Sequence, residues 1–190
     1  MQKILVITGS TRPGRKGAAV AKWFMESTKD EKAFTFELAD LAEINLPMLD
    51  EPVPALFGKY QNEHTKAWAA QLASADGFVI VTPEYNHGYP ASLKNAIDYT
   101  YVEWNHKPVA FVSYGVIGGV RAVEQLKPVI SRLDAVPLDA QVSLALGTHF
   151  TEDGLVKADS QVQNDLTAMI KSLAWWGDAL KAARQKIKHA

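Results

Sequence analysis

Three cationic side chains, Arg12, Arg15 and Lys16, lie close together in a glycine-containing segment near the start of the chain. The segment runs from Gly9 to Gly17, between an apolar run and a stretch with helical periodicity. The backbone N–H groups of such a loop, together with the N-terminus of the following helix, favour an anion. Cations at that helix end oppose the helix dipole unless an anion lies among them. The pattern therefore favours a phosphate site over a flexible turn with solvated charges.

This segment differs from two common phosphate-binding loops. Gly9 and Gly14 have the spacing of P-loop glycines, but Arg15 and Lys16 stand where that loop needs Lys followed by Ser or Thr. The Mg²⁺-binding hydroxyl of a nucleoside triphosphatase is therefore missing. The G-x-G-x-x-G spacing that holds a dinucleotide pyrophosphate is absent as well. A monophosphate at the end of a smaller ligand fits better.

A second segment, from Thr82 to Pro90, combines two prolines with aromatic and amide side chains. The prolines restrict the backbone, whereas Gly88 permits a sharp bend. Tyr85 and Tyr89 offer flat apolar surfaces, and Asn86 offers both a donor and an acceptor. This composition suits a flat heterocycle with polar edges. A stiff turn whose tyrosines cover a helix end fits equally well when the segment is considered alone.

A third segment, from Ser113 to Gly119, contains glycines at positions 115, 118 and 119. Glycines let a ligand approach the backbone closely and free N–H groups at the start of the next helix. The segment is not a nucleophile elbow, because Phe111 stands where that motif requires glycine. A structural turn is the alternative to a ligand site.

Apolar runs rich in Val, Ile and Phe alternate with stretches of helical periodicity, which predicts a parallel sheet with helices on both faces. The expected strands are Lys3–Thr8, Thr35–Leu38, Gly77–Thr82, Val109–Ser113 and Pro137–Leu144. The expected helices are Ala18–Thr28, Glu63–Ser74, Ser92–Tyr101, Val120–Leu133 and Gln161–Lys188. Five strands in one domain over residues 1–190 favour a doubly wound α/β sheet with strand order 2-1-3-4-5. The three segments above would then meet at the carboxyl edge of the sheet.

The overall composition limits the classes of partner. The chain has 190 residues, a hydrophobic fraction of 47% and a formal net charge of −1, which argues against nucleic acid or an anionic membrane as partner. It contains no cysteine, which excludes thiolate chemistry and fits a reducing compartment. The first apolar run ends at Gly9 and is too short for a signal peptide or a membrane span. We therefore expect a cytoplasmic protein.

These residues resemble the NADPH-dependent FMN reductase family, flavodoxin-like proteins that include flavin, quinone, azo-dye and chromate reductases. The resemblance rests on the stretches Gly9–Arg12, Pro83–Pro90 running into Ser92–Asp98, and Ser113–Gly115 with Gly118 and Gly119. Pro83-Glu84-Tyr85-Asn86 is the most specific of them. The resemblance implies FMN as cofactor and NADPH or NADH as electron donor.

The resemblance also implies roles for individual residues. The phosphate would be held by Ser10, Arg12 and the backbone around Lys16, Gly17 and Ala18. The isoalloxazine would be bordered by Pro83, Glu84, Tyr85 and Asn86, and on its other edge by Ser113, Tyr114, Gly115, Gly118 and Gly119. Arg15 stands where many relatives have serine, so its role cannot be carried over. One hypothesis is that Arg15 and Lys16 face the 2′-phosphate of NADPH.

The expected function is an FMN-dependent NAD(P)H oxidoreductase that reduces flavin, quinone or other small oxidants by ping-pong hydride transfer through flavin N5. No side chain need act as acid or base. The first alternative is a flavodoxin-like electron carrier that does not oxidise NAD(P)H, although such carriers tend to be acidic. The second is a flavin-free binding module with the same fold.

The family resemblance also implies the oligomeric state, a homodimer or homotetramer. The aromatics Tyr89, Tyr99, Tyr101 and Trp104 are either interface anchors or ordinary core residues. The five histidines have no metal-ligand spacing, and only His87 lies in a candidate site segment.

Overall fold

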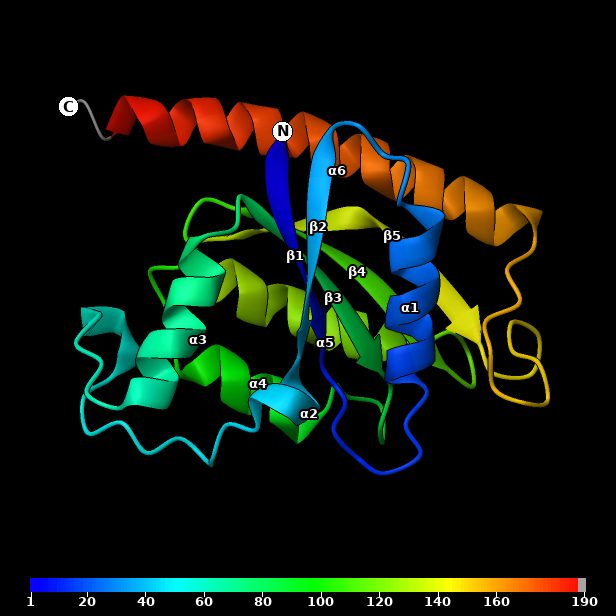
Figure 1. The fold of residues 1–190 in the computed structure, drawn as a ribbon, viewed down its shortest axis with the longest axis horizontal. Coiled ribbons are helices and arrows are strands. Elements are labelled where there is room, and N and C mark those ends of the chain that lie inside the picture. Colours follow the sequence, from blue (N-terminus) through cyan, green and yellow to red (C-terminus); the bar gives the residue numbers. More distant parts are fainter. Residues whose placement is uncertain (188–190) are drawn as a thin grey trace.

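A computed structural model describes residues 1–187 of the chain (Figure 1). Its strands are β1 Gln2–Thr8, β2 Phe34–Asp40, β3 Gly77–Pro83, β4 Pro108–Gly115 and β5 Val136–Ala145. All neighbouring strands pair in parallel, in the order β2-β1-β3-β4-β5. The five predicted strands, their order and the flavodoxin-like doubly wound fold class are confirmed.

The helices alternate with the strands along the chain. They are α1 Gly17–Ser27, α2 Leu41–Ile44, α3 Glu63–Ala73, α4 Ala91–Asp98, α5 Val120–Arg132 and α6 Ser160–Ile187, with a short 3₁₀ helix, η1, at Ala55–Phe57. The five predicted helices are present. Helix α4 ends at Asp98, before the predicted end at Tyr101, and Lys188 of the last predicted helix lies outside the described residues. Elements α2 and η1 were not predicted.

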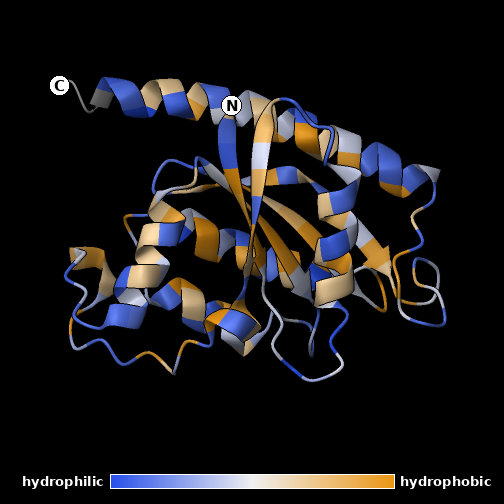
Figure 2. Ribbon diagram, in the orientation of Figure 1, coloured by the Kyte–Doolittle hydropathy of each residue, from blue (hydrophilic) through white to orange (hydrophobic). Residues whose placement is uncertain are grey.

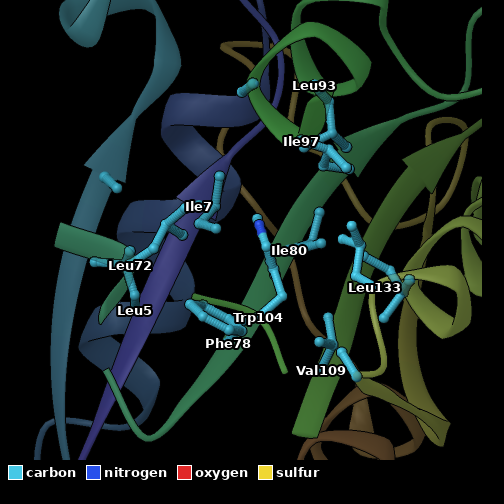
Figure 3. Close-up of a cluster of buried hydrophobic side chains, with 14 of the residues drawn as sticks. Leu5, Ile7, Leu72, Phe78, Ile80, Leu93, Ile97, Trp104, Val109 and Leu133 are labelled. Carbon is cyan, nitrogen blue, oxygen red and sulfur yellow. The ribbon is translucent and has the colours of Figure 1, made fainter. Parts of the chain in front are cut away.

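Two apolar cores cover the two faces of the sheet, because alternate strand residues point to opposite sides. The core against α3, α4 and α5 includes the strand residues Leu5, Ile7, Phe78 and Ile80 (Figure 3). The core against α1 and α6 includes Ile4, Val6, Val79 and Val81. The central strands are therefore hydrophobic along most of their length (Figure 2). This packing fixes the strand ends from which the candidate site segments emerge.

The aromatic residues considered as interface anchors belong to the first core. Tyr99 and Trp104 are fully buried, and the Trp104 ring packs on Phe78 with centroids 4.4 Å apart. Tyr89 and Tyr101 are partly buried against the same core. Packing within the chain therefore accounts for Tyr99 and Trp104, whereas a role of Tyr89 and Tyr101 in an interface stays a prediction.

Candidate functional site

The three candidate segments leave adjacent strands at one edge of the sheet. Strands β1, β3 and β4 are direct neighbours and run in parallel, so their carboxyl ends lie side by side. The loops that follow β1, β3 and β4 therefore share the lower edge of the sheet in Figure 1. Ligands of doubly wound folds bind in the crevice at this edge. The predicted convergence of the three segments is thus present.

The loop after β1 has Ser10 at its centre. Ser10 is fully buried, and its Oγ lies 3.1 Å from the hydroxyl oxygen of Tyr114 at the end of β4. Burial raises the pKa of Tyr114 to about 12, so this phenol is neutral at physiological pH. A Cβ atom at Gly17 would overlap Ser10 Oγ and lie 3.0 Å from the Tyr114 hydroxyl. Gly17 is therefore required for the close approach of helix α1 to this pair.

The start of helix α1 offers free backbone donors. Lys16 is the N-cap residue, but its side chain makes no capping hydrogen bond, and the first turn contains no acidic residue. The first N–H groups of a helix have no partner within the helix and carry a partial positive charge. Gly17 and Ala18 belong to this first turn. This end of the helix is suited to a phosphate group.

The three cations of the loop have different environments. Arg12 is exposed, and its guanidinium donates to the carbonyl of the adjacent Pro13 at 3.1 Å. Lys16 Nζ lies over the ring of Phe150, 5.0 Å from its centroid. Arg15 forms a bidentate pair with Asp40 at 2.8 and 2.7 Å. The structure brings Arg12 and Lys16 to the rim of the loop and gives Arg15 a partner within the chain.

The Arg15–Asp40 pair connects the loop to the end of β2. Arg15 also donates to the carbonyl oxygen of Ser10 at 3.0 Å, while Asp40 accepts from the backbone N–H of Ala42 at the start of α2. Arg15 thus holds the backbone of Ser10 relative to strand β2. A contact between Arg15 and a cofactor phosphate stays a prediction.

The loop after β3 is a two-residue hairpin turn. Tyr85 and Gly88 exchange both backbone hydrogen bonds, at 2.9 and 3.0 Å, while Asn86 and His87 have positive φ angles of 50° and 67°. Positive φ at both central positions defines a type I′ turn, which asparagine favours. The sharp bend was expected at Gly88, and it lies instead at Asn86 and His87. Both of their side chains are exposed at the edge of the sheet.

The loop after β4 is held by Ser113 and by two glycines. The hydroxyl of Ser113, which is fully buried, donates to the carbonyl of Gly118 at 2.7 Å. Gly118 and Gly119 have φ angles of 84° and 78°, and a Cβ at Gly119 would lie 2.8 Å from the backbone nitrogen of Tyr114. Only glycine fits there, and helix α5 starts directly afterwards without a side-chain cap. Ser113 is therefore bonded within its own loop, while the backbone of the loop faces the crevice edge.

Glu84 connects the loops after β3 and β4. Its backbone N–H donates to the carbonyl of Tyr114 at 3.0 Å, and its carboxylate accepts from the backbone N–H of Arg121 at 3.2 Å. The same carboxylate forms an ion pair with the Arg121 guanidinium. Arg121 in turn contacts His87 Nε2 at 2.7 Å. These contacts fix the relative position of the two loops.

The sequence reasoning missed three residues of this region. Asp40 binds Arg15, and Arg121 binds Glu84. In each pair the two residues are more than twenty positions apart in the chain, so no local pattern indicates the pairing. Phe150 follows β5 and packs against Lys16 and Tyr114, with ring centroids of Phe150 and Tyr114 6.3 Å apart. Nothing in the local sequence indicates that the segment after β5 returns to the loop after β1.

The strand order and the helices on both faces define a doubly wound α/β protein with a donor-rich carboxyl edge. The sequence profile of the NADPH-dependent FMN reductase family matches residues 2–149. An NAD(P)H-dependent FMN reductase of Schizosaccharomyces pombe is 52% identical over 129 residues, which cover 67% of this chain and 64% of that protein. A quinone reductase of Escherichia coli K12 is 35% identical over 146 residues, covering 73% and 75% of the two chains. The chain belongs to the NADPH-dependent FMN reductase family.

A solved structure agrees with the fold. A flavoenzyme NAD(P)H:(acceptor) oxidoreductase from Paracoccus denitrificans superimposes with a TM-score of 0.74 at 24% identity, covering 94% of this chain and 98% of that one. The expected family is confirmed. Within residues 1–187, none of the helices is both long and apolar enough to span a membrane.

Proposed function

We propose that this chain binds FMN at the carboxyl edge of its sheet and catalyses ping-pong electron transfer from NADPH or NADH to a small acceptor. The observation that supports it most strongly is the convergence of three loops from adjacent strands with the open N-terminus of α1. When bound, FMN supplies hydride transfer at N5, first from the nicotinamide and then to a flavin, quinone or other oxidant. The chain itself supplies binding and orientation.

The residues present fit the phosphate end of FMN. The first turn of α1 offers unpaired N–H groups, and Arg12 and Lys16 add positive charge at the rim. Thr8 Oγ1 at the end of β1 is buried without a hydrogen-bond partner among the described residues. The neutral Tyr114 beside Ser10 adds no negative charge that would repel a phosphate. In our proposal Ser10, Arg12 and the backbone of Lys16, Gly17 and Ala18 hold the phosphate.

The other two loops are assigned to the ring. Pro83, Glu84, Tyr85 and Asn86 would border one edge of the isoalloxazine, and the second edge would face Ser113, Tyr114, Gly115, Gly118 and Gly119. The type I′ turn and the glycines support this assignment, since backbone without side chains lets a flat ring approach closely. Backbone N–H groups near Asn86 and Gly115 would stabilise negative charge that develops on the ring during reduction.

A visible spectrum tests the proposal. The protein, purified without added cofactor and then mixed with FMN, should show the bound-flavin absorbance, and NADPH or NADH alone should bleach it in the absence of oxygen. Bleaching by NAD(P)H alone excludes an electron carrier that does not oxidise NAD(P)H. A preparation that stays colourless after addition of FMN contradicts the proposal and favours a flavin-free module.

Steady-state kinetics test the shared site. With NAD(P)H and a quinone as substrates, parallel lines in the double-reciprocal plot are expected, because the oxidised nicotinamide must leave before the quinone binds. Intersecting lines would show that both substrates are bound together and would contradict the ping-pong scheme.

We also propose that the chain assembles as a homodimer or homotetramer and is cytoplasmic. Exposed apolar side chains gather on the segment between α2 and α3, where Met48 and Phe57 are 77% and 62% exposed. Such side chains are favourable in subunit contacts. Light scattering after size exclusion measures the mass, and a monomer at working concentration would contradict the assembly.

A further inference from the structure

The ion pair between Glu84 and Arg121 lies between two of the proposed flavin-binding loops. Glu84 is the first residue after β3, and its side chain is only 6% exposed. Arg121 is the second residue of α5, and its side chain is 39% exposed. Glu84 immediately precedes Tyr85 and Asn86, which the proposed function places beside the isoalloxazine. With FMN bound as proposed, the pair would place one negative and one positive charge next to the ring.

The two charges are closely balanced. The Glu84 carboxylate forms an ion pair with the Arg121 guanidinium and also accepts from the backbone N–H of Arg121 in the first turn of α5. A carboxylate removed from water needs such partners, because an unpaired buried charge is costly. On the outer side His87 Nε2 lies 2.7 Å from an Arg121 guanidinium nitrogen. Among the described residues Glu84 is the anion that pairs with Arg121, while the buried Arg121 Nε has no hydrogen-bond partner there.

Hydride transfer to FMN adds two electrons and one proton, so the ring becomes one unit more negative. A nearby positive charge stabilises this added charge, and a nearby negative charge opposes it. In a site shielded from water these effects are larger than in solution. An intact Glu84–Arg121 pair has little net effect, whereas loss of either partner exposes the other charge to the ring.

We propose that the Glu84–Arg121 pair sets the reduction potential of the bound FMN by keeping the charge beside the ring balanced. The inference rests on the proposed function, since it assumes that FMN occupies this edge. Neither residue takes part in hydride transfer. Both act through the electrostatic field and through the position of the two loops.

Reduction potentials of charge-altering variants test the inference. In E84Q the amide keeps the shape of the side chain and leaves Arg121 unbalanced, so the potential should rise. In R121M the carboxylate is left unbalanced, so the potential should fall. In the double variant E84Q/R121M the potential should return toward that of the wild type. The potentials are measured by dye-coupled anaerobic titration at neutral and alkaline pH, and the ratio of dissociation constants for oxidised and reduced FMN gives the same shift independently.

The sign of the shifts separates an electrostatic role from a purely structural one. If the pair only held the loops together, both single variants would loosen the site and shift the potential in the same direction, toward that of free FMN. R121K keeps the charge without the forked geometry, so its potential should stay close to that of the wild type. Equal signs in E84Q and R121M, or no shift in either, would overturn the inference.

The matched control is D76N at the opposite end of the same strand. Asp76 immediately precedes β3 and pairs with Lys181 and Arg184, so it is a similar ion pair away from the crevice. The potential of D76N should equal that of the wild type. Failure of the wild-type protein to bind FMN would overturn the proposed function. If the protein binds FMN but the reduction potentials of E84Q and R121M do not shift in opposite directions, this inference alone is overturned.

Discussion

Strand β3 has an acidic residue next to each of its ends, and in both places a helix supplies an arginine as partner. At the amino end, Asp76 pairs with Lys181 at 3.0 Å and with Arg184 at 3.4 Å, both from α6. At the carboxyl end, Glu84 pairs with Arg121 from the first turn of α5. The first pair attaches the long helix α6 to the sheet. The second holds two loops in position at the edge where the helices begin.

This difference follows from the direction of the strands. In a parallel sheet the helices that follow the strands start at the carboxyl edge, so their free N–H groups lie there. Helix α1 begins at this edge without a side-chain cap, whereas at the start of α5 the Glu84 carboxylate accepts from the N–H of Arg121. At the amino edge the backbone groups of Asp76 and Lys3 bind each other, with Asp76 N donating to Lys3 O at 2.7 Å. We therefore expect substitutions at the amino edge to change stability and those at the carboxyl edge to change FMN binding.

The largest effect is expected from Gly17→Ala. The new Cβ would overlap Ser10 Oγ, so the proposed phosphate loop must shift. If FMN binding must reverse this shift, at a cost of about 1–3 kcal/mol as for overpacking, the FMN dissociation constant rises by about 5- to 150-fold. Quenching of FMN fluorescence on binding measures this constant. The matched control is Gly177→Ala in α6, whose Cβ would press only on the end of the Gln2 side chain. Unchanged FMN affinity in Gly17→Ala would contradict the assignment of this loop.

The next effect concerns stability at the amino edge. Asp76→Asn should lower the free energy of unfolding by about 1–2 kcal/mol at neutral pH, a value reduced for the partial exposure of the pair to solvent. FMN affinity should not change. Urea denaturation compares the two proteins, and a loss of FMN affinity without loss of stability would reverse the expected division between the edges.

The same substitution has a predictable pH dependence. Burial alone would raise the pKa of Asp76, but the bonds from Lys181 and from the backbone N–H of Lys3 outweigh it, and the pKa is lowered. A group with a lowered folded pKa stabilises the protein above its unfolded pKa, about 3.9 for Asp, and loses this contribution as the pH falls further. The difference between wild type and Asp76→Asn should therefore shrink in acid.

A smaller effect is expected at the Arg15–Asp40 pair. Asp40→Asn removes a negative charge near the proposed phosphate site, so simple attraction would tighten FMN binding. Because Arg15 holds the carbonyl of Ser10, we expect instead about fivefold weaker binding, corresponding to about 1 kcal/mol for one weakened hydrogen-bonded pair. Isothermal calorimetry distinguishes the two signs. Tighter binding would show that Arg15, once released, contacts the phosphate directly.

The smallest effect is expected at an exposed pair on α4. Lys94 and Asp98 are four residues apart, with side chains 44% and 39% exposed. Asp98→Asn should change the free energy of unfolding by no more than about 0.5 kcal/mol, with FMN affinity unchanged. Thermal unfolding of the FMN-loaded protein measures this change. A loss above about 1 kcal/mol would show that the contribution of these ion pairs to stability does not decrease with their exposure to solvent.

The three central strands, β1, β3 and β4, were predictable because each is an apolar run that is buried on both faces. Strand β3 is buried at every residue, and its alternate side chains enter different cores. Elements α2 and η1 have only four and three residues, which is too short to show helical periodicity. Helix α4 ends at Asp98, and the buried Tyr99 that follows donates its hydroxyl to Asp50 at 2.9 Å, a bond that the periodicity of the sequence does not indicate.

The segments of the site were predictable from composition, but the bonds within them were not. Glycines, prolines and cations marked the three loops, and the parallel order of the strands brought them to one edge. The partners of Arg15 and Glu84 come from other elements of the fold, and nothing in the local sequence indicates them. The position of the turn at Asn86 and His87 depends on left-handed backbone at two residues other than glycine, which composition alone does not indicate.

Helix α6 determines when this protein can complete folding during its synthesis. It supplies Val162, Leu166, Met169 and Leu173 to the core on one face of the sheet and packs on β4 and β5. All five strands leave the ribosome before this helix does. Until then, apolar residues of β4 and β5 stay uncovered on the growing chain, which makes this interval the period of greatest exposure to aggregation or to chaperone binding.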